Sequence, residues 1–61
     1  MDMLSILLLA RKEQINVVRD AASDVERAYI YDMRKAADKL ILELDKFEDL
    51  GKMIKENGGE V

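Results

Sequence analysis

The first 50 residues of this chain contain neither proline nor glycine. These residues are the strongest interruptions of regular secondary structure, so only polar side chains are left to end a helix in this stretch. His and Cys are absent from the whole chain, which removes the commonest general base, the commonest metal ligands and the thiol nucleophile. We therefore expect an all-α protein that is not an enzyme, with no catalytic residues, no cofactor and no metal site.

The small size of the chain limits how it can become stable. A chain of 61 residues forms one domain at most and buries only about 60% of its unfolded surface. Small domains compensate with disulfides, a metal or oligomerisation, and the lack of Cys and His argues against the first two. We therefore expect a homo-oligomer, either a dimer or a tetramer, or a chain that folds against another protein.

Apolar residues recur at separations of three and four along most of the chain, which is the pattern of one helical face. The apolar arc is wider than the seam of a two-stranded coiled coil, and this width is typical of helices in a globular bundle. The residues predicted to form the oligomer or partner interface are Leu4, Leu8, Ile15, Val18, Val25, Tyr29, Met33, Leu40, Leu44 and Phe47.

The middle of the chain carries conflicting signals for a turn. Residues 23–26 read Ser-Asp-Val-Glu, which fits the S-x-x-E capping box and predicts a turn near residues 20–24. Asp32 is a second candidate, which would divide the chain more evenly. The apolar phase from Ile15 to Tyr29, however, runs through residues 20–24 as it would in one unbroken helix. We predict a helical hairpin that self-associates into a four-helix bundle; the alternative is a single long helix in a coiled coil.

The helical ends are marked by capping residues. Asp2 is a candidate N-cap, and the last helix is expected to end either at Gly51 or at Asn57-Gly58-Gly59. The sequence thus predicts one helical domain over residues 1–57 and a frayed tail over residues 58–61.

Two polar positions interrupt the apolar pattern. Arg11 lies in the seam with Gln14 beside it, and a polar layer at such a place can fix the register and number of chains. The alternative is that the long stem of Arg11 passes its apolar neighbours and carries the charge to water. Glu43 is the one acid near the bundle face, where Lys39 or Lys46 could neutralise it.

A possible surface binding patch consists of Arg27, Tyr31 and Arg34, which share one face if the chain is helical there. An exposed aromatic ring between two guanidinium groups can stack a base or a partner's side chain. The alternative is a Tyr ring packed beneath Arg stems on a solvated surface. The net charge of −3 disfavours a nucleic-acid partner, because phosphate binding requires a basic surface.

The N-terminal run over residues 4–10 is apolar nearly all around a helix, so one neighbouring helix cannot cover it. It could lie in the centre of an oligomer, dock on a different protein, or enter a membrane interface. The run is far shorter than the ~20 residues that span a bilayer. Asp2 replaces the positive start of a signal peptide, so we expect a cytoplasmic protein without a membrane span.

The function predicted from these features is that of a small regulatory or adaptor protein, which self-associates and binds another protein. In length, acidity and its polar C-terminal tail the chain resembles Rop, the small plasmid RNA-binding regulators in which two helical hairpins form a four-helix bundle. This resemblance implies the alternative of a dimeric nucleic-acid-binding regulator. It rests on no sequence motif, so no RNA-binding residue is carried over. A further alternative, a structural coiled-coil spacer, requires the unbroken helix.

Overall fold

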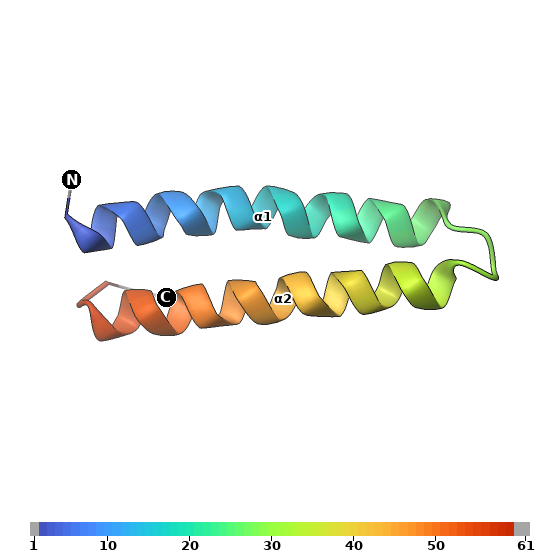
Figure 1. Ribbon diagram of the computed structural model, residues 1–61. Coiled ribbons are helices and arrows are strands. Elements are labelled where there is room, and N and C mark those ends of the chain that lie inside the picture. The colour runs from blue at the N-terminus through green and yellow to red at the C-terminus, as the bar shows by residue number, and fades with distance from the viewer. Residues whose placement is uncertain (1, 60–61) are drawn as a thin grey trace.

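The computed structural model describes residues 2–59 and consists of two antiparallel helices joined by a short loop (Figure 1). Helix α1 spans Met3–Arg27 and helix α2 spans Met33–Glu56. The hairpin measures 43 × 16 × 14 Å, so it is long and thin. The predicted helical hairpin is therefore confirmed, and the alternative of a single long helix is wrong.

Helix α1 begins at the expected cap. The Asp2 carboxylate accepts a hydrogen bond from the backbone N–H of Ser5, with 2.8 Å between Oδ1 and N. This bond satisfies one of the backbone donors that the first turn leaves without a partner. Hydrogen bonding by Ser5 also holds the pKa of Asp2 below its usual value, because the charged form of the carboxyl is the better acceptor.

The turn lies at residues 28–32 and not at residues 20–24. The capping-box prediction was wrong because Ser23 lies inside α1, where the helix continues. The second candidate is confirmed, since Asp32 directly precedes α2. The Asp32 side chain makes no capping hydrogen bond; instead its backbone N–H donates to the carbonyl oxygen of Tyr29 at 2.8 Å and closes the turn.

Helix α2 ends at the second of the two predicted stops. Gly51 lies inside the helix and is buried, whereas Asn57 is the C-cap. Gly58 has a φ of +85°, and its N–H donates to Lys55 O while that of Gly59 donates to Ile54 O. This is the Schellman arrangement, which needs a left-handed residue after the cap. Of the frayed tail predicted over residues 58–61, Gly58 and Gly59 make these hydrogen bonds to the helix end, and Glu60 and Val61 lie outside the described residues.

The two helices face each other along heptad positions. In both helices the inward positions recur at alternating steps of three and four, the 3.5-residue period of a coiled coil. Most of them are buried or half-buried. The inward positions are Leu4, Leu7, Arg11, Gln14, Val18, Ala21 and Val25 in α1, and Ala36, Leu40, Glu43, Phe47, Leu50 and Ile54 in α2.

The fully enclosed part of this core is small. Among the described residues, the buried apolar side chains are Leu7, Ala21 and Ile54. At the open end of the hairpin, Gly59 packs against both helices, because a Cβ built on it would lie 2.5 Å from Ile54 Cγ2 and 2.8 Å from Leu4 Cδ1. A single hairpin therefore leaves most of its large apolar side chains in contact with water.

Candidate interaction surface

One side of the hairpin carries an uncharged stripe on both helices. Each of its residues directly follows an inward position. We call this set the apolar face; it consists of Leu8, Ile15 and Ala22 from α1, and Ala37, Leu44 and Gly51 from α2. In a two-stranded coiled coil the positions that flank the seam are normally charged, so their apolar character here points to a further packing partner.

The two halves of the apolar face lie on the same side of the molecule. Ile15, Val18 and Arg19 of α1 line one hollow of about 230 Å³ together with Leu44 and Phe47 of α2. Leu8 and Leu44 are 40% and 42% exposed, respectively, and Ile15 is exposed as well. These large side chains are therefore exposed at the surface, beside a hollow whose lining is mainly apolar.

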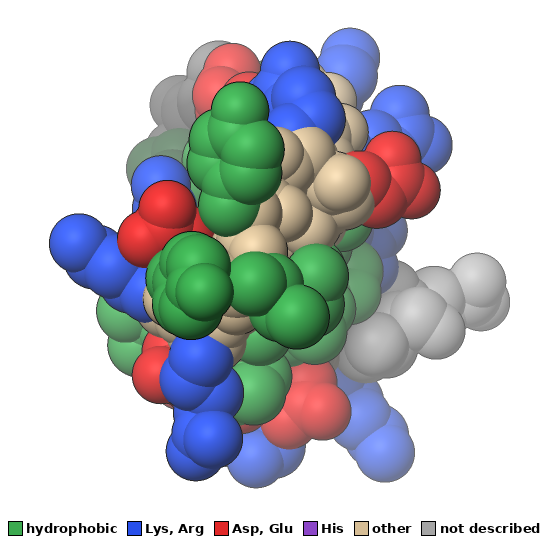
Figure 2. All heavy atoms as spheres, turned by 90° about the vertical axis from the view of Figure 1, so that its right-hand side faces the viewer, with side chains coloured by type: hydrophobic (Ala, Val, Ile, Leu, Met, Phe, Trp, Pro, Cys, Tyr) green, Lys and Arg blue, Asp and Glu red, His purple; other side chains and the backbone are tan. Residues whose placement is uncertain are grey.

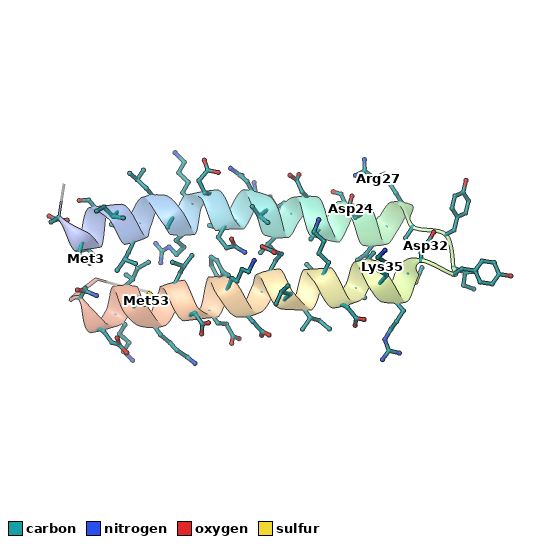
Figure 3. All side chains as sticks on the ribbon, viewed as in Figure 1. Met3, Asp24, Arg27, Asp32, Lys35 and Met53 are labelled. Atoms are coloured by element: carbon teal, nitrogen blue, oxygen red, sulfur yellow. The ribbon has the colours of Figure 1, made fainter. Side chains whose placement is uncertain are left out.

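The opposite side of the hairpin is different in character. Near the loop it has a hollow of about 340 Å³, whose lining includes Asp24, Asp32, Lys35 and Lys39. Figure 3 shows the charged side chains of Asp24, Arg27, Asp32 and Lys35 gathered at this end, whereas Met3 and Met53 lie at the open end. Of the residues that directly precede an inward position, Met3, Ala10, Val17 and Met53 are also apolar, but Asp24, Lys39 and Lys46 are charged. Only the apolar face is therefore without charge along both helices.

The centre of the seam is polar. Gln14 Nε2 donates to the Glu43 carboxylate at 2.7 Å and to the Glu43 backbone carbonyl at 2.9 Å. Lys46 Nζ donates to the other carboxylate oxygen at 3.2 Å. The hydrogen bond from Gln14, followed by that from Lys46, lowers the pKa of Glu43 although its burial acts in the opposite direction. This buried acid is therefore held in its charged form.

The structure explains part of the predicted polar layer. Lys46, one of the two lysines expected near Glu43, pairs with it. Sequence reasoning noted Gln14 only as a neighbour of Arg11 and missed its bond to Glu43. Arg11 is half-buried at an inward position and borders a hollow of about 470 Å³ with Phe47 and Gly51 among its lining.

The ten residues predicted as an interface divide into two groups. Leu4, Val18, Val25, Leu40 and Phe47 occupy inward positions and are half-buried. Leu8, Ile15, Tyr29, Met33 and Leu44 are exposed. Leu8, Ile15 and Leu44 belong to the apolar face, whereas Tyr29 lies in the loop and Met33 is the first residue of α2.

The loop presents three large exposed side chains. Tyr29, Ile30 and Tyr31 follow one another at the tip, and Tyr31 is 95% exposed. Figure 2, which looks onto this end, shows hydrophobic side chains gathered there and flanked by charged ones. Ile30 therefore belongs to the loop and not to the apolar stripe of α2.

The Arg27, Tyr31 and Arg34 patch does not have the geometry that the sequence suggested. Helix α1 ends at Arg27, so the three residues do not share one helical face. The exposure of Tyr31 also excludes a ring packed beneath the Arg stems. Arg27 pairs with Asp24 at 3.1 Å and Arg34 with Asp38 at 3.7 Å, which offsets the positive charge expected to attract nucleic acid.

The described part of the chain holds no cluster of three or more metal-ligating side chains. Neither α1 nor α2 is apolar over a length sufficient to cross a membrane. Comparisons of the chain with protein-family models, with curated proteins and with solved structures found no match.

Proposed function

We propose that this protein is a non-enzymatic adaptor that self-associates through its apolar face and binds a further protein through its exposed loop. The observation that carries the proposal is the apolar face itself. It holds no charged residue in either helix, although large members such as Leu8 and Leu44 are exposed. Leaving such a contiguous patch in water is unusual for a protein that works as a monomer.

The surface area of the hairpin supports self-association. The chain exposes 5009 Å², whereas a compact monomer of 7.0 kDa is expected to expose about 4000 Å². The excess is close to the roughly 800 Å² that each partner contributes to a standard protein interface. Burial of one face against a second hairpin would therefore bring this chain to the exposure of an ordinary globular protein.

The loop is the proposed contact for the further protein. Aromatic residues are enriched at protein interfaces, where their large rings supply contact area. Tyr29 and Tyr31 extend beyond the helices, so a partner could reach them while the apolar face is occupied. The two contacts of the adaptor are therefore separate in space.

The experiment that tests the proposal compares two matched substitutions by sedimentation equilibrium. Leu44→Asp places a charge in the apolar face, and Leu42→Asp places the same charge at an exposed position of α2 outside it. Burial of one Leu contributes about 1.5–3 kcal/mol, and a symmetric dimer loses two. We expect Leu44→Asp to raise the dissociation constant by about 100-fold or more and Leu42→Asp to leave it nearly unchanged. Equal dissociation constants for the two variants would refute the proposal.

A further inference from the structure

The packing of the two helices fixes the position of each residue along the long axis of the hairpin. We call this position the height of the residue. Ile15 lies across the apolar groove from Leu44, since both border the same hollow. Because the helices are antiparallel, seven residues back along α1 correspond to seven residues forward along α2. Leu8 therefore lies at the height of Gly51. By the same step in the other direction, Ala22 lies at the height of Ala37.

The outer edges of the apolar face can be placed in the same way. Residues four positions after a member of the face, or three before one, lie on its outer edge; we call them the rim. The rim consists of Ser5, Lys12, Arg19 and Glu26 in α1, and of Arg34, Ile41, Glu48 and Lys55 in α2. Lys12 lies at the height of Glu48, and Glu26 lies at that of Arg34.

We propose that two copies of the chain pack their apolar faces together with both loops at the same end of the dimer. This inference rests on the proposed self-association and adds its orientation. The two-fold axis then runs parallel to the helices, so α1 of one copy lies on α2 of the other. Every residue keeps its height, and residues at equal heights on α1 and α2 meet across the interface.

The apolar side chains are complementary in this orientation. Leu8 lies over the partner's Gly51, at the hollow of about 470 Å³ that Gly51 lines together with Arg11 and Phe47. Ile15 meets the partner's Leu44, and these large side chains fill the middle of the interface. Ala22 meets the partner's Ala37, and these small side chains let the two chains approach closely near the loops. The opposite orientation, with loops at the two ends, places α2 on α2 and sets Gly51 against Ala37, which leaves a void that costs stability.

The rim charges favour the same orientation. With both loops at one end, Lys12 faces the partner's Glu48 and Glu26 faces the partner's Arg34, and each pair occurs twice by symmetry. With the loops at opposite ends, Lys12 would face Arg19 and Arg34 would face Lys55, so like charges would meet. Charge complementarity of this kind selects orientation more than it adds affinity.

In this orientation both chains of the adaptor contribute to one binding surface at the loop end of the dimer. The two loops, each with its exposed Tyr29, Ile30 and Tyr31, would lie beside each other on one end of the dimer. A partner protein would then meet six large side chains on a single surface, which neither chain offers alone.

Pulsed dipolar spectroscopy on spin labels tests the orientation. The natural chain has no Cys, so single variants can be labelled cleanly. A label at Tyr31→Cys reports on the loops, and a label at Asp45→Cys, near the middle of α2, serves as the control because its coupling reports any face-to-face dimer. We expect a Tyr31 to Tyr31 separation of no more than about twice the 16 Å width of the hairpin. A separation near its 43 Å length would overturn the orientation.

The control separates the two levels of the proposal. Dipolar coupling at Asp45 with a long Tyr31 separation would leave self-association standing and reject the orientation. Absence of coupling at Asp45 at concentrations well above micromolar would reject self-association and the orientation with it.

A charge reversal gives a second test, because it should change the affinity of the dimer in opposite directions for the two orientations. Lys12→Glu should weaken the dimer several-fold at low salt if Lys12 faces Glu48, and should strengthen it if Lys12 faces Arg19. Adding Glu48→Lys to Lys12→Glu should restore the affinity. Lys35→Glu, which changes the net charge equally on the other side of the hairpin, should have little effect.

Discussion

Gln14 of α1 holds Glu43 of α2 by two hydrogen bonds from one amide nitrogen, 2.7 Å to the carboxylate and 2.9 Å to the backbone carbonyl. This link lies in the middle of an otherwise largely apolar seam and joins residues 29 positions apart. A buried polar link costs stability when its partners are mispaired, so it specifies one alignment of the two helices. The register on which the apolar face depends is therefore set here.

The first prediction concerns acid stability. The pKa of Glu43 is lowered in the folded chain, and the hydrogen bond from Gln14 is the largest cause. The ionised carboxylate therefore stabilises the folded state at pH values above 4.5, the ordinary pKa of the group. That contribution is lost as the pH falls below 4.5 and through the folded pKa. Gln14→Leu should therefore destabilise the protein more at pH 7 than at pH 3. Urea midpoints at fixed protein concentration measure the difference, and an equal loss at both pH values would contradict the assignment.

The second prediction concerns the buried core. Ile54 is fully enclosed, so Ile54→Ala should leave a cavity and lower the free energy of unfolding by about 2–5 kcal/mol. Leu42→Ala, at an exposed position of the same helix, should change it by about 0.5 kcal/mol or less. Urea denaturation followed by circular dichroism compares the two variants. Similar losses in both would mean that Ile54 is not enclosed.

The third prediction tests the position of the turn. Ser23 lies inside α1 and is exposed, so Ser23→Ala should raise stability by up to about 0.5 kcal/mol, because Ala is the better helix former. A helix starting at Ser23 would instead lose its cap, and the same substitution would then cost about 1 kcal/mol. The sign of the change in thermal midpoint decides between the two structures.

The fourth prediction separates the loop from folding and self-association. Tyr29 and Tyr31 are among the most exposed side chains of the protein, so the double substitution Tyr29→Ser with Tyr31→Ser should leave helix content and the dissociation constant unchanged. Circular dichroism and sedimentation would show this. Dissociation of the double variant would mean that the loop takes part in the self-association interface.

The all-α fold could be predicted from the sequence because helical periodicity covers nearly all of the chain, but this continuity did not favour a hairpin over one long helix. The position of the turn was harder to predict, since residues 28–32 contain neither glycine nor proline. Tyr and Ile are only moderately weaker helix formers than Ala, so their cluster gives little local signal. The capping box at Ser23 gave a stronger signal for a turn, but this signal was false. The inward positions continue through Ala21 and Val25, and their packing keeps the helix unbroken there.

The inward positions were predicted only in part for a related reason. Leu7 and Leu8 are both apolar, as are Val17 and Val18, so the apolar arc alone does not show which residue faces the other helix. The inward position at 14 is Gln, whereas the flanking position at 15 is Ile. Sequence periodicity therefore follows the apolar Ile15, and the Gln14 to Glu43 pair becomes evident only when both helices are placed.

The most direct test of the account is the mass of the natural protein in solution, measured by sedimentation equilibrium over a range of micromolar concentrations. The account predicts a dimer of twice the 7.0 kDa chain mass that dissociates on dilution together with loss of helix content. A stable helical monomer at 7.0 kDa throughout this range would contradict the claim that the apolar face is a self-association surface.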